Sequence, residues 1–450
     1  MREAVLVVLS SLLAGCRTAE SDWRTALVRG AGVVRLPAGV VEVSTELRLP
    51  AEADGFELAG HPRGTILRAA AKFRGRALLV AAGGRRIRLR DLTIDGNRGA
   101  VATPAGLPPG DVPFARFSTA NGVLADSVDR LTISNVRFRE IAGFAILVAR
   151  SRRVDIERVT VESSGGRQPN GRNNATGGIL IEEGTAGFQV RDSVFRHILG
   201  NAVWTHSLYT SPRNSDGRIS GNRFETIGRD AIQIGHATRV AVEDNSGARI
   251  GYPADAVDVE GGGTPVAIDT AGNVDASRYL RNRFEEINGK CVDLDGFHHG
   301  EVRGNTCLNT GGAEQYPFGH YGIVMNNTNP DMQSEAISIT QNVIEGMKFG
   351  GLFVIGSGHR ISGNRFLRLN TAGCNENAAR FGCSHFAGEP DLLQTGIYLG
   401  RRAERPARTH GNTIEDNEIA GHGMRTRCVG AAPGVALSAS TIRNNRCSDQ

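Results

Sequence analysis

The sequence predicts an all-β solenoid, a right-handed parallel β-helix of about eleven rungs with an N-terminal cap. The first observation is a recurring phrase: an aliphatic residue, Asn three positions later, a bulky apolar residue two positions on, and a second aliphatic residue three positions after that. Copies occur at Ile219–Ile227, Val302–Cys307, Ile339–Met347, Ile361–Leu369 and Ile414–Ile419. They start roughly 22 or 23 residues apart, or that distance plus an insertion, as in repeat architectures. Such small units must stack to bury their apolar residues.

A second phrase follows the first: a small residue, then an aliphatic residue, any residue and another aliphatic residue. Examples are Ala145–Val148, Gly178–Ile181, Ala231–Ile234, Gly322–Met325, Gly351–Val354 and Gly396–Leu399. Alternation with period two over so few residues predicts short strands with one buried face. We expect the recurring Asn at an inner turn, where its amide bonds the Asn of the next rung. Asn222, Asn305 and Asn364 should therefore occupy equivalent turns.

Composition agrees with one long, narrow core. The chain has 58 Gly, 6% aromatic and 40% hydrophobic residues among its 450. A solenoid grows by adding rungs, so we expect one structural unit despite this length. The net charge is only +5, and no aromatic side chains alternate with basic ones, so no nucleic-acid partner is expected.

The N-terminus carries a targeting signal. Ala4 to Leu13 is an apolar run too short to span a bilayer, as in a signal peptide. The following Leu13-Ala14-Gly15-Cys16 resembles a bacterial lipobox, which implies residues 1–16 as a lipoprotein signal with lipidation at Cys16. We expect export from a bacterium, followed by lipid anchoring at the cell envelope or periplasmic or extracellular release, with membrane contact only through that lipid. The alternative is an ordinary secretory signal with an incidental Cys.

Residues 17–100 are predicted to form the cap and first rungs, and residues 101–450 the β-helix with inserted loops. Gly32–Val40 and Leu89–Asn97 resemble the opening rungs of the pectate-lyase-like superfamily. A cap would cover the unpaired strand edges at that end. Insertions at roughly 103–120, 165–176, 207–217, 262–278 and 370–394 are expected to wall a groove.

An exported protein folds in an oxidising compartment, where its cysteines can form disulfides. Cys374 and Cys383 bracket a short polar insertion and are the predicted disulfide pair. Cys307 and Cys447 occupy the slot that Phe fills in other rungs, so buried small hydrophobic side chains are at least as expected there.

Polar side chains gather in the middle rungs when the second phrases are aligned. The successive rungs carry Asn201, Trp204 and His206; Asp230, Gln233 and His236; Asp255, Asp258 and Glu260; Lys290, Asp293, Asp295 and His298; and His320, Tyr321 and Asn326. Rungs stack about 4.8 Å apart, so these side chains should lie within about 15 Å. Stacked acids repel one another, and a bound cation, shared protons or the Lys290 ammonium must offset this. The alternative is a solvated structural patch.

One resemblance is to polygalacturonase-type glycoside hydrolases. Asp255-Ala256-Val257-Asp258 resembles their Asn-Thr-Asp-x-x-Asp strand, Gly289–Val292 stands where they have Gly-Asp-Asp-Cys, and Gly319–Ile323 resembles their Gly-His-Gly strand. The family's acidic pair is replaced by Gly289 and Lys290, and its Arg-Ile-Lys motif is missing. This resemblance implies inverting hydrolysis, with Asp255 and either Asp293 or Asp295 about 6.5–9.5 Å apart as the catalytic acids.

A second resemblance is to pectate lyases of the same superfamily, which hold calcium with an Asp cluster and use Lys or Arg as the base. It implies β-elimination, with Lys290 as the base and His320 or Tyr321 as the proton donor. The implied Ca²⁺ ligands are Asp230, Asp255, Asp258, Glu260 and Asp295. A nearby cation would lower the Lys290 pKa so that the neutral amine could take a proton.

We therefore expect a carbohydrate-active enzyme that cleaves an acidic, uronic-acid-containing polysaccharide, by elimination rather than hydrolysis. The expected substrate-binding side chains are Trp204, His206, Gln233, His236, His298 and Asn326. The alternatives are an inverting glycoside hydrolase and a non-catalytic surface protein that binds glycan or strengthens the envelope, since one fold hosts many functions.

The lipobox can be tested directly. A Cys16→Ala variant should lose labelling by a radioactive lipid precursor and leave the membrane fraction, because the thioether attachment point is gone. Unchanged membrane association of this variant, against the wild type as control, would contradict lipidation.

Overall fold

A computed structural model describes residues 23–30, 32–101, 106–168, 170–258, 264–374, 381–384, 386 and 388–449. The predicted signal with Cys16, and the predicted ligand Glu260, lie outside the described residues. Residues 23–29 are helical, and Trp23 and Leu27 of this helix are buried in the core. No described helix is long and apolar enough to cross a membrane.

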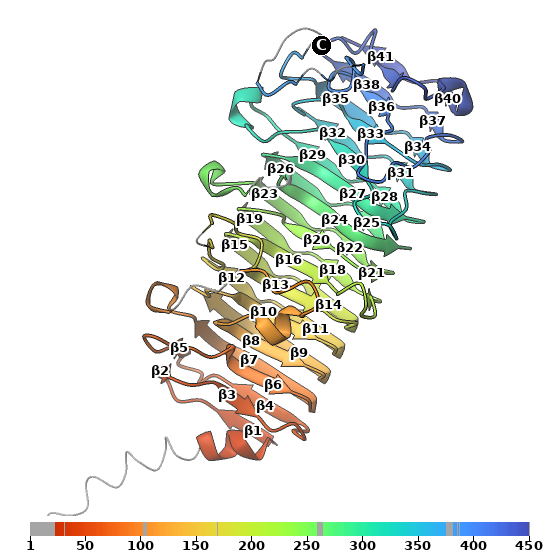
Figure 1. Ribbon diagram of the computed structural model, residues 1–450. Helices are drawn as coiled ribbons and strands as arrows, with labels where there is room; N and C mark the ends of the chain where they lie inside the picture. The colour runs from red at the N-terminus through yellow and green to blue at the C-terminus, as the bar shows by residue number, and fades with distance from the viewer. Residues whose placement is uncertain are drawn as a thin grey trace, which may run out of the picture.

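The chain winds into a coil whose strands form three columns of parallel pairs (Figure 1). The first column consists of β3 (Leu47–Leu49), β6 (Ala77–Ala82), β8 (Asn121–Asp126), β10 (Phe144–Ala149), β13 (Gly177–Glu182), β16 (Asn201–His206), β20 (Ile232–Ile234), β24 (Val266–Asp275), β27 (Lys290–His298), β30 (Ile323–Asn326), β33 (Leu352–Val354), β36 (Ile397–Leu399) and β39 (Val429–Ala431). Eleven of these strands follow the N-terminal region, from β8 onward, which matches the predicted number of rungs.

The other two columns complete each turn. The second consists of β1 (Gly32–Arg35), β4 (Phe56–Ala59), β7 (Arg85–Asp95), β9 (Asp129–Arg139), β11 (Arg152–Glu157), β14 (Ala186–Arg191), β17 (Asn214–Ser215), β18 (Arg218–Ser220), β21 (Ala237–Thr238), β22 (Ala241–Glu243), β25 (Arg278–Leu280), β28 (Glu301–Arg303), β31 (Ser338–Thr340), β34 (Arg360–Ser362), β37 (Thr413–Glu415) and β40 (Thr441–Arg443). The third consists of β2 (Gly39–Val43), β5 (Thr65–Ala69), β12 (Thr160–Glu162), β15 (Val194–Ile198), β19 (Arg223–Ile227), β23 (Ser246–Ile250), β26 (Arg283–Ile287), β29 (Thr306–Leu308), β32 (Val343–Glu345), β35 (Arg365–Leu369), β38 (Glu418–Gly421) and β41 (Arg446–Ser448), and the long strands β7 and β9 also pair into it.

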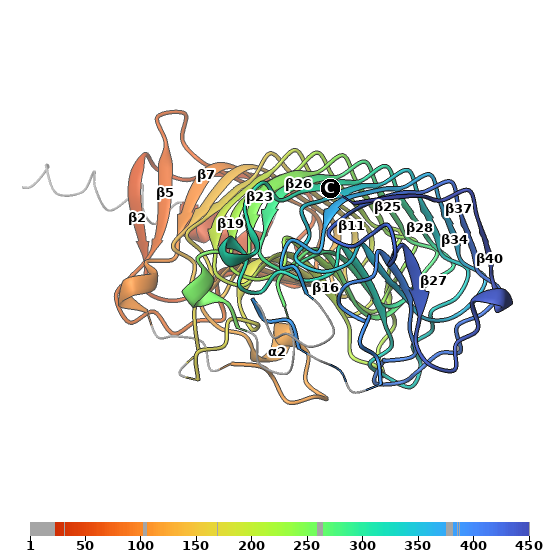
Figure 2. The same cartoon turned by 90° about the horizontal axis from the view of Figure 1, so that it is seen from above.

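Short helical turns lie in the connections: α2 (Phe114–Phe117) and the 3₁₀ turns η1 (Arg98–Ala100), η2 (Ala254–Ala256), η4 (Ala313–Gln315) and η5 (Leu437–Ala439). Seen from above, α2 and several insertions project from one side of the coil (Figure 2). Inside the coil, like side chains stack from rung to rung, as in Phe195 on Phe224 with ring centroids 5.0 Å apart. The predicted fold class is confirmed.

The recurring Asn residues form a continuous buried ladder at the turn before the third column. It runs through Asn222, Asn245, Asn282, Asn305, Asn342, Asn364, Asn417 and Asn445, with amide-to-amide distances of 2.9 to 3.0 Å. Each Oδ1 also accepts the backbone N–H of the preceding Asn, as Asn342 does from Asn305 at 2.9 Å. The predicted equivalence of Asn222, Asn305 and Asn364 is confirmed. The sequence pattern did not identify Asn282, because Tyr279 stands three positions before it, where the phrase has an aliphatic residue.

Three disulfides lie within the described residues. They join Cys291 to Cys307, Cys374 to Cys383, and Cys428 to Cys447. The reading of Cys307 and Cys447 as simple buried hydrophobic residues is wrong, because Cys307 is bonded to Cys291 of β27 and Cys447 to Cys428, which precedes β39.

The ladder should be a main source of stability. Asn305→Ala removes side-chain bonds to Asn342 and to the carbonyl of Tyr279 and leaves those buried groups unsatisfied, so we expect a loss of about 3 kcal/mol in the free energy of unfolding. Asn445→Ala is the matched control, because this half-exposed Asn ends the ladder and water can replace its bonds. Equal losses in urea unfolding of the two variants would contradict a buried-ladder effect.

Candidate active site

The strand register places four polar or aromatic side chains in one outward-facing row. Trp204 of β16 lies beside Gln233 of β20, and Gln233 lies beside Asp269 of β24. In the next pair Ile268 lies beside Val292, which sets Asp269 beside Asp293 of β27. Because side chains alternate along a strand, the flanking Ile and Val residues point into the core while this row faces outward. We call Asp230, Asp269, Asp293 and Asp295, with Lys290, the acid cluster.

Hydrogen bonds link the row across rungs. The Asn201 amide donates to Gln233, and the Gln233 amide donates to Asp269 Oδ2 at 2.6 Å. The Lys290 ammonium donates to Asp293 Oδ2. The second oxygen of Asp293, Oδ1, is buried without any hydrogen-bond partner in the described part of the chain. Such an atom is available to a water molecule or a ligand.

Two carboxyls of the acid cluster have strongly raised pKa values. Burial raises the pKa of Asp230 to about 6, although the charge of Arg229 and a hydrogen bond from the Val266 N–H oppose the shift. Burial, and then the negative charge of Asp293, raise the pKa of Asp295 to about 6. The Thr328 backbone N–H donates to Asp295 at 2.9 Å and limits that shift. Both carboxyls can therefore hold a proton in mildly acidic solution.

Asp269 is the functional candidate that sequence reasoning missed. Burial, followed by the charges of Asp230 and Asp293, raises its pKa well above the ordinary range. Its signal was Ala267-Ile268-Asp269-Thr270, a strand phrase in which Thr270 takes the place of the last aliphatic residue. Thr270 is buried, and its hydroxyl is hydrogen-bonded to Tyr279 at 2.7 Å, which explains why a polar residue is tolerated there.

The predicted rung containing Asp255 and Asp258 is wrong. Asp255 lies in the 3₁₀ turn η2 and is exposed, and neither residue belongs to a strand, because the strand of this rung is β24. Asp258 instead forms ion pairs with Arg172 at 3.3 Å and Arg229 at 3.6 Å. The insertions around residues 167–173 and 254–258 hold each other in this way beside the groove.

The described residues expected to bind calcium do not fit that ion. Arg172 and Arg229 neutralise Asp258, Arg229 also lies 3.6 Å from Asp230, and Asp255 is exposed on the turn η2. A hard cation needs several converging oxygen ligands, which these carboxyls do not provide. No step of the chemistry is derived through calcium.

Lys290 is cationic rather than a neutral base. Burial alone would lower its pKa, but the hydrogen bond and charge of Asp293, with the charges of Asp269 and Asp295, outweigh this and raise the pKa. The lowering expected beside a bound cation stays a prediction. The ammonium balances part of the negative charge of the acid cluster.

His320 and Tyr321 differ in their suitability for proton transfer. Burial, and then the charges of Lys290 and Lys348, lower the pKa of His320 to about 3, so its ring is neutral. Its Nδ1 is buried without a partner among the described residues. Tyr321 is buried, and its hydroxyl donates to the Leu392 carbonyl, so it is not free to act as the expected proton donor.

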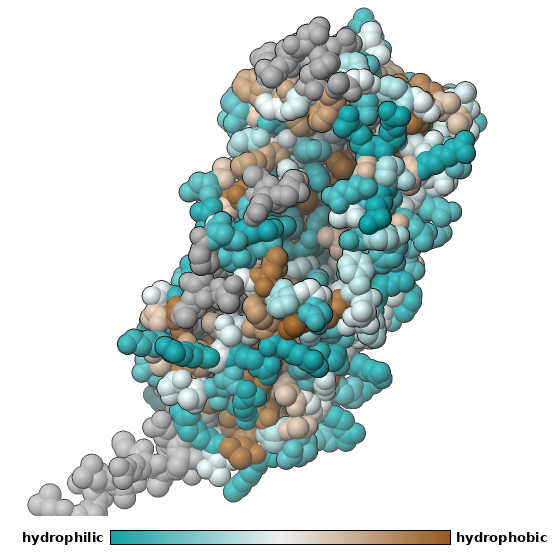
Figure 3. Space-filling model, viewed as in Figure 1, coloured by the Kyte–Doolittle hydropathy of each residue, from teal (hydrophilic) through white to brown (hydrophobic). Residues whose placement is uncertain are grey.

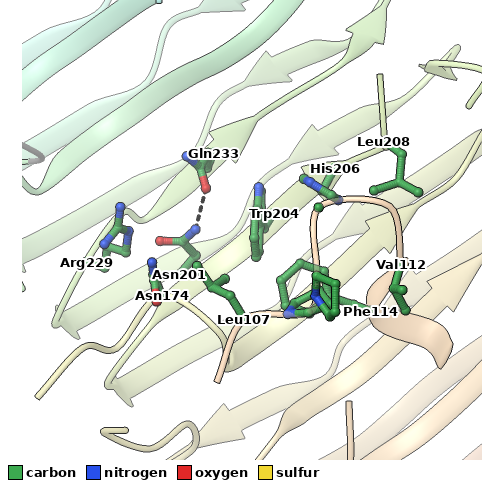
Figure 4. A pocket seen from close by; sticks show the side chains of 13 residues that line it. Leu107, Val112, Phe114, Asn174, Asn201, Trp204, His206, Leu208, Arg229 and Gln233 are labelled. Atoms are coloured by element: carbon green, nitrogen blue, oxygen red, sulfur yellow. Dashed lines mark hydrogen bonds between the residues drawn. The ribbon is translucent and has the colours of Figure 1, made fainter. Parts of the chain in front are cut away.

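Three predicted substrate-binding residues, Trp204, His206 and Gln233, converge on one cavity of about 310 Å³ beside the acid cluster. Asn201, Gln233 and Arg229 lie at its polar end, and Trp204, Phe114 and His206 lie at its apolar end (Figure 4). The space-filling view shows a largely hydrophilic face that is hollowed between the insertions (Figure 3). An aromatic ring beside amide and guanidinium groups is typical of a sugar-binding pocket.

The other predicted binding residues, His236, His298 and Asn326, do not line this cavity. His236 packs edge-on against Tyr209, with ring centroids 4.1 Å apart, and burial lowers its pKa to about 4. Burial also lowers the pKa of His298, whose Nδ1 lies 3.2 Å from the Gly296 carbonyl. The Asn326 amide donates to Thr328 Oγ1 at 3.3 Å.

One group of described residues brings three possible metal ligands within 4.8 Å: Glu182, Glu183 and His206. Both carboxylates already have partners. Glu182 accepts two backbone N–H groups of α2, and Glu183 accepts the Leu208 N–H at 2.8 Å. The group therefore serves to hold the surrounding insertions.

Comparison with known proteins supports this architecture. Residues 117–267 match the family model described as a right-handed β-helix region. The chain is a right-handed parallel β-helix protein. A search of curated proteins finds no match.

Solved structures with this β-helix include both enzymes and adhesins. An exopolygalacturonase from Thermotoga maritima is 13% identical, with a TM-score of 0.53 over 80% of this chain and 88% of that one. PfbA, a surface adhesin of Streptococcus pneumoniae, is 13% identical, with a TM-score of 0.54 over 79% and 87%. ORF18 of Geobacillus virus E2 is 13% identical, with a TM-score of 0.49, and the match covers 69% of this chain but only about half, 54%, of the viral one. The likeness at these identities is one of fold, the right-handed parallel β-helix.

The raised pKa of Asp295 makes a testable contribution to stability. The Asp295 carboxyl has a higher pKa in the folded than in the unfolded state. Its contribution to the free energy of unfolding is therefore complete below the unfolded-state pKa, and it is lost as the pH rises through the folded-state pKa of about 6. Asp295→Asn cannot ionise, so its free energy of unfolding should improve relative to wild type by about 2 kcal/mol between about pH 4 and pH 7. Urea titrations at several pH values measure this difference.

Asp244→Asn is the control for that experiment. A hydrogen bond from Arg281 lowers the Asp244 pKa, so removing this carboxylate cannot produce a gain as pH rises. A pH-independent difference between Asp295→Asn and wild type would contradict the raised pKa.

Proposed function

We propose that the protein is a glycoside hydrolase that cleaves an acidic polysaccharide with Asp269 and Asp293 as its catalytic carboxyl pair. The observation that carries this is the contrast between two carboxyls on adjacent rungs. Asp269 is buried with an amide as its hydrogen-bond partner, whereas Asp293 is bonded to the Lys290 ammonium. Environments that separate the protonation of two neighbouring carboxyls are the pattern by which glycosidases assign acid and nucleophile roles.

Asp269 takes the role of general acid. Burial, followed by the charges of Asp230 and Asp293, raises its pKa well above the ordinary range, which favours the protonated form that a general acid needs. The Gln233 amide donates to Oδ2, which leaves the proton on the other oxygen. That proton passes to the glycosidic oxygen as the bond to the leaving sugar breaks.

Asp293 takes the role of nucleophile. Lys290 stabilises its negative charge through Oδ2, and Oδ1 has no partner among the described residues. Adjacent rungs are about 4.8 Å apart, which is close to the roughly 5–5.5 Å between the carboxyls of retaining enzymes. Oδ1 then bonds the anomeric carbon, and a water molecule that gives its proton to Asp269 releases the sugar.

The same geometry argues against elimination. Removing a proton beside a uronate carboxylate needs a neutral base, and the charge and hydrogen bond of Asp293 help to raise the pKa of Lys290. Lys290 and Arg229 nevertheless lie beside the acid cluster, and their positive charge favours an acidic glycan over a neutral one. The fold itself is shared by an exopolygalacturonase and an adhesin, so the choice between catalysis and binding rests on these residues.

The proposal is tested with a panel of uronic-acid polysaccharides assayed for new reducing ends and for the ultraviolet absorbance of unsaturated products. We expect reducing ends without unsaturation, no effect of a chelator, and a loss of about 10²–10⁴ in kcat for Asp269→Asn and Asp293→Asn. Asp244→Asn, an exposed acid on another face, is the matched control and should retain full activity.

Nuclear magnetic resonance of the first-formed product distinguishes the roles further. Retention of the anomeric configuration fits Asp293 as nucleophile, whereas inversion would transfer the second role to Asp295, two residues along the strand. Unsaturated products that disappear in Lys290→Ala would overturn hydrolysis in favour of elimination. Glycan binding without either product would leave a binding protein.

A further inference from the structure

The outward face of the first column is polar and open only in its middle rungs. On the N-terminal side the outward residues are Leu124, Leu147 and Leu180, and all three are fully buried. They pack with Phe114 and Ala115 of α2 in an apolar cluster that lies outside the coil and is separate from its core. Helix α2 therefore closes this end of the face.

A buried carboxylate fixes that closure. Glu182 is 0% exposed and accepts the backbone N–H groups of Phe114 at 3.0 Å and Ala115 at 2.5 Å. Phe114 then meets Trp204 edge to face, with ring centroids 5.2 Å apart. The open groove begins at Trp204.

A second insertion closes the C-terminal side. Beyond Asp293 the outward row continues through Val324, Phe353 and Tyr398, and Tyr398 is 1% exposed. The Tyr398 hydroxyl is bonded to Glu389 at 3.1 Å, and the Tyr321 hydroxyl is bonded to the Leu392 carbonyl. The segment 388–394 therefore lies over the face from β30 to β36.

The stretch of the outward face between these walls is short. It runs from Trp204 on β16 to Val324 on β30, which is four rung steps or about 19 Å. The cavity opens at its Trp204 end, and Gln233, Asp269 and Asp293 along it are each 7% exposed. A pyranose unit in an extended glycan advances by about one rung, so about four sugar units fit. The catalytic pair lies two and three steps from Trp204, which leaves room for about two units on the Trp204 side.

We propose that the groove recognises the end of a glycan chain or a short oligosaccharide, not the interior of a long polymer, and that the cavity beside Trp204 receives the terminal sugar. The ligand class, a glycan, rests on the proposed function. The Trp204 ring offers a stacking surface, and Arg229, Asn201 and Gln233 offer hydrogen bonds to the hydroxyls of that terminal unit. Phe114 prevents the chain from continuing toward β13.

Intrinsic fluorescence can test this in the full chain, because the sequence has only two Trp residues. In a Trp23→Phe, Asp293→Asn background, Trp204 is the sole reporter and turnover is blocked. The probes are monomer-to-octamer ladders of galacturonate, mannuronate and glucuronate, with the corresponding polymers. We expect quenching whose affinity per chain rises up to about the tetramer and is flat for longer chains, since only ends bind. An affinity per chain that keeps rising with length, or no quenching by any ladder, would overturn the inference.

Variants of the wall sharpen the test. Phe114→Ala should open the groove and raise octamer affinity over tetramer affinity by about tenfold. Phe117→Ala is the matched control, since this residue is on the same helix but does not line the cavity. If Phe114→Ala does not fold, Glu182→Gln should loosen the same wall and shift the length dependence in the same direction. Identical length dependence in Phe114→Ala and Phe117→Ala would contradict closure by Phe114.

The two proposals fail separately. A rapid early fall in polymer viscosity during hydrolysis would overturn end recognition and leave the hydrolase intact. End-dependent quenching in a protein that cleaves nothing would overturn hydrolysis and support end recognition.

Discussion

The stacking of rungs in fixed register, secured by the buried Asn ladder, is the constraint on which the rest of the structure depends. Each ladder amide satisfies its neighbour and a backbone carbonyl, as Asn305 does for Asn342 and Tyr279. A slip of one residue would break this chain of bonds and turn every outward side chain inward. The register therefore allows side chains from strands more than twenty residues apart, such as Trp204 and Gln233, to form one row.

That rigid register has an electrostatic consequence. It brings Asp269 and Asp293 together on adjacent rungs and buries both, whereas a solvated surface would leave both carboxyls in water. The repulsion is reduced in two different ways. Burial raises the pKa of Asp269, which favours its uncharged form, and Asp293 is bonded to the Lys290 ammonium. The disulfide from Cys291 to Cys307 anchors the strand that carries Lys290 and Asp293 to the opposite side of its rung, so this unequal pair is held in place.

The fold was predictable because its determinants are local and repeated. Asn phrases such as Ile339–Met347 and strand phrases such as Ala231–Ile234 recur often enough that single exceptions do not hide the period. The candidate site was predictable in outline for the same reason, since alignment of strand phrases identifies Gln233 and Asp293 as outward-facing residues of the same row. The limits of this approach appear where an insertion interrupts the period. There the sequence Asp255-Ala256-Val257-Asp258 resembles a strand but forms part of a 3₁₀ turn and its connection, and the strand of this rung, β24 with Asp269, follows the insertion.

Protonation states could not be predicted, because they depend on neighbours from several rungs. Lys290 was expected to lose its proton near a cation, whereas the charge and hydrogen bond of Asp293 help to raise its pKa. The pairing of Asp258 with Arg172 likewise joins two insertions whose paths the repeat does not specify. Tyr321 lies at the predicted place in its rung, but the segment containing Leu392 covers it, and the Leu392 carbonyl accepts a hydrogen bond from its hydroxyl.

The distribution of polarity along the outward face connects the fold to its use. A solenoid repeats its scaffold at every rung, so nothing in the scaffold itself distinguishes a middle rung from an end rung. The distinction comes from side chains that the core does not need: leucines such as Leu147 and Leu180 beneath α2, and the Gln233–Asp269–Asp293 row between the walls. Apolar outward residues require a cover, and the cover limits the groove. The same apolar side chains that hold the insertions against the coil therefore also limit how much of a glycan can reach the carboxyl pair.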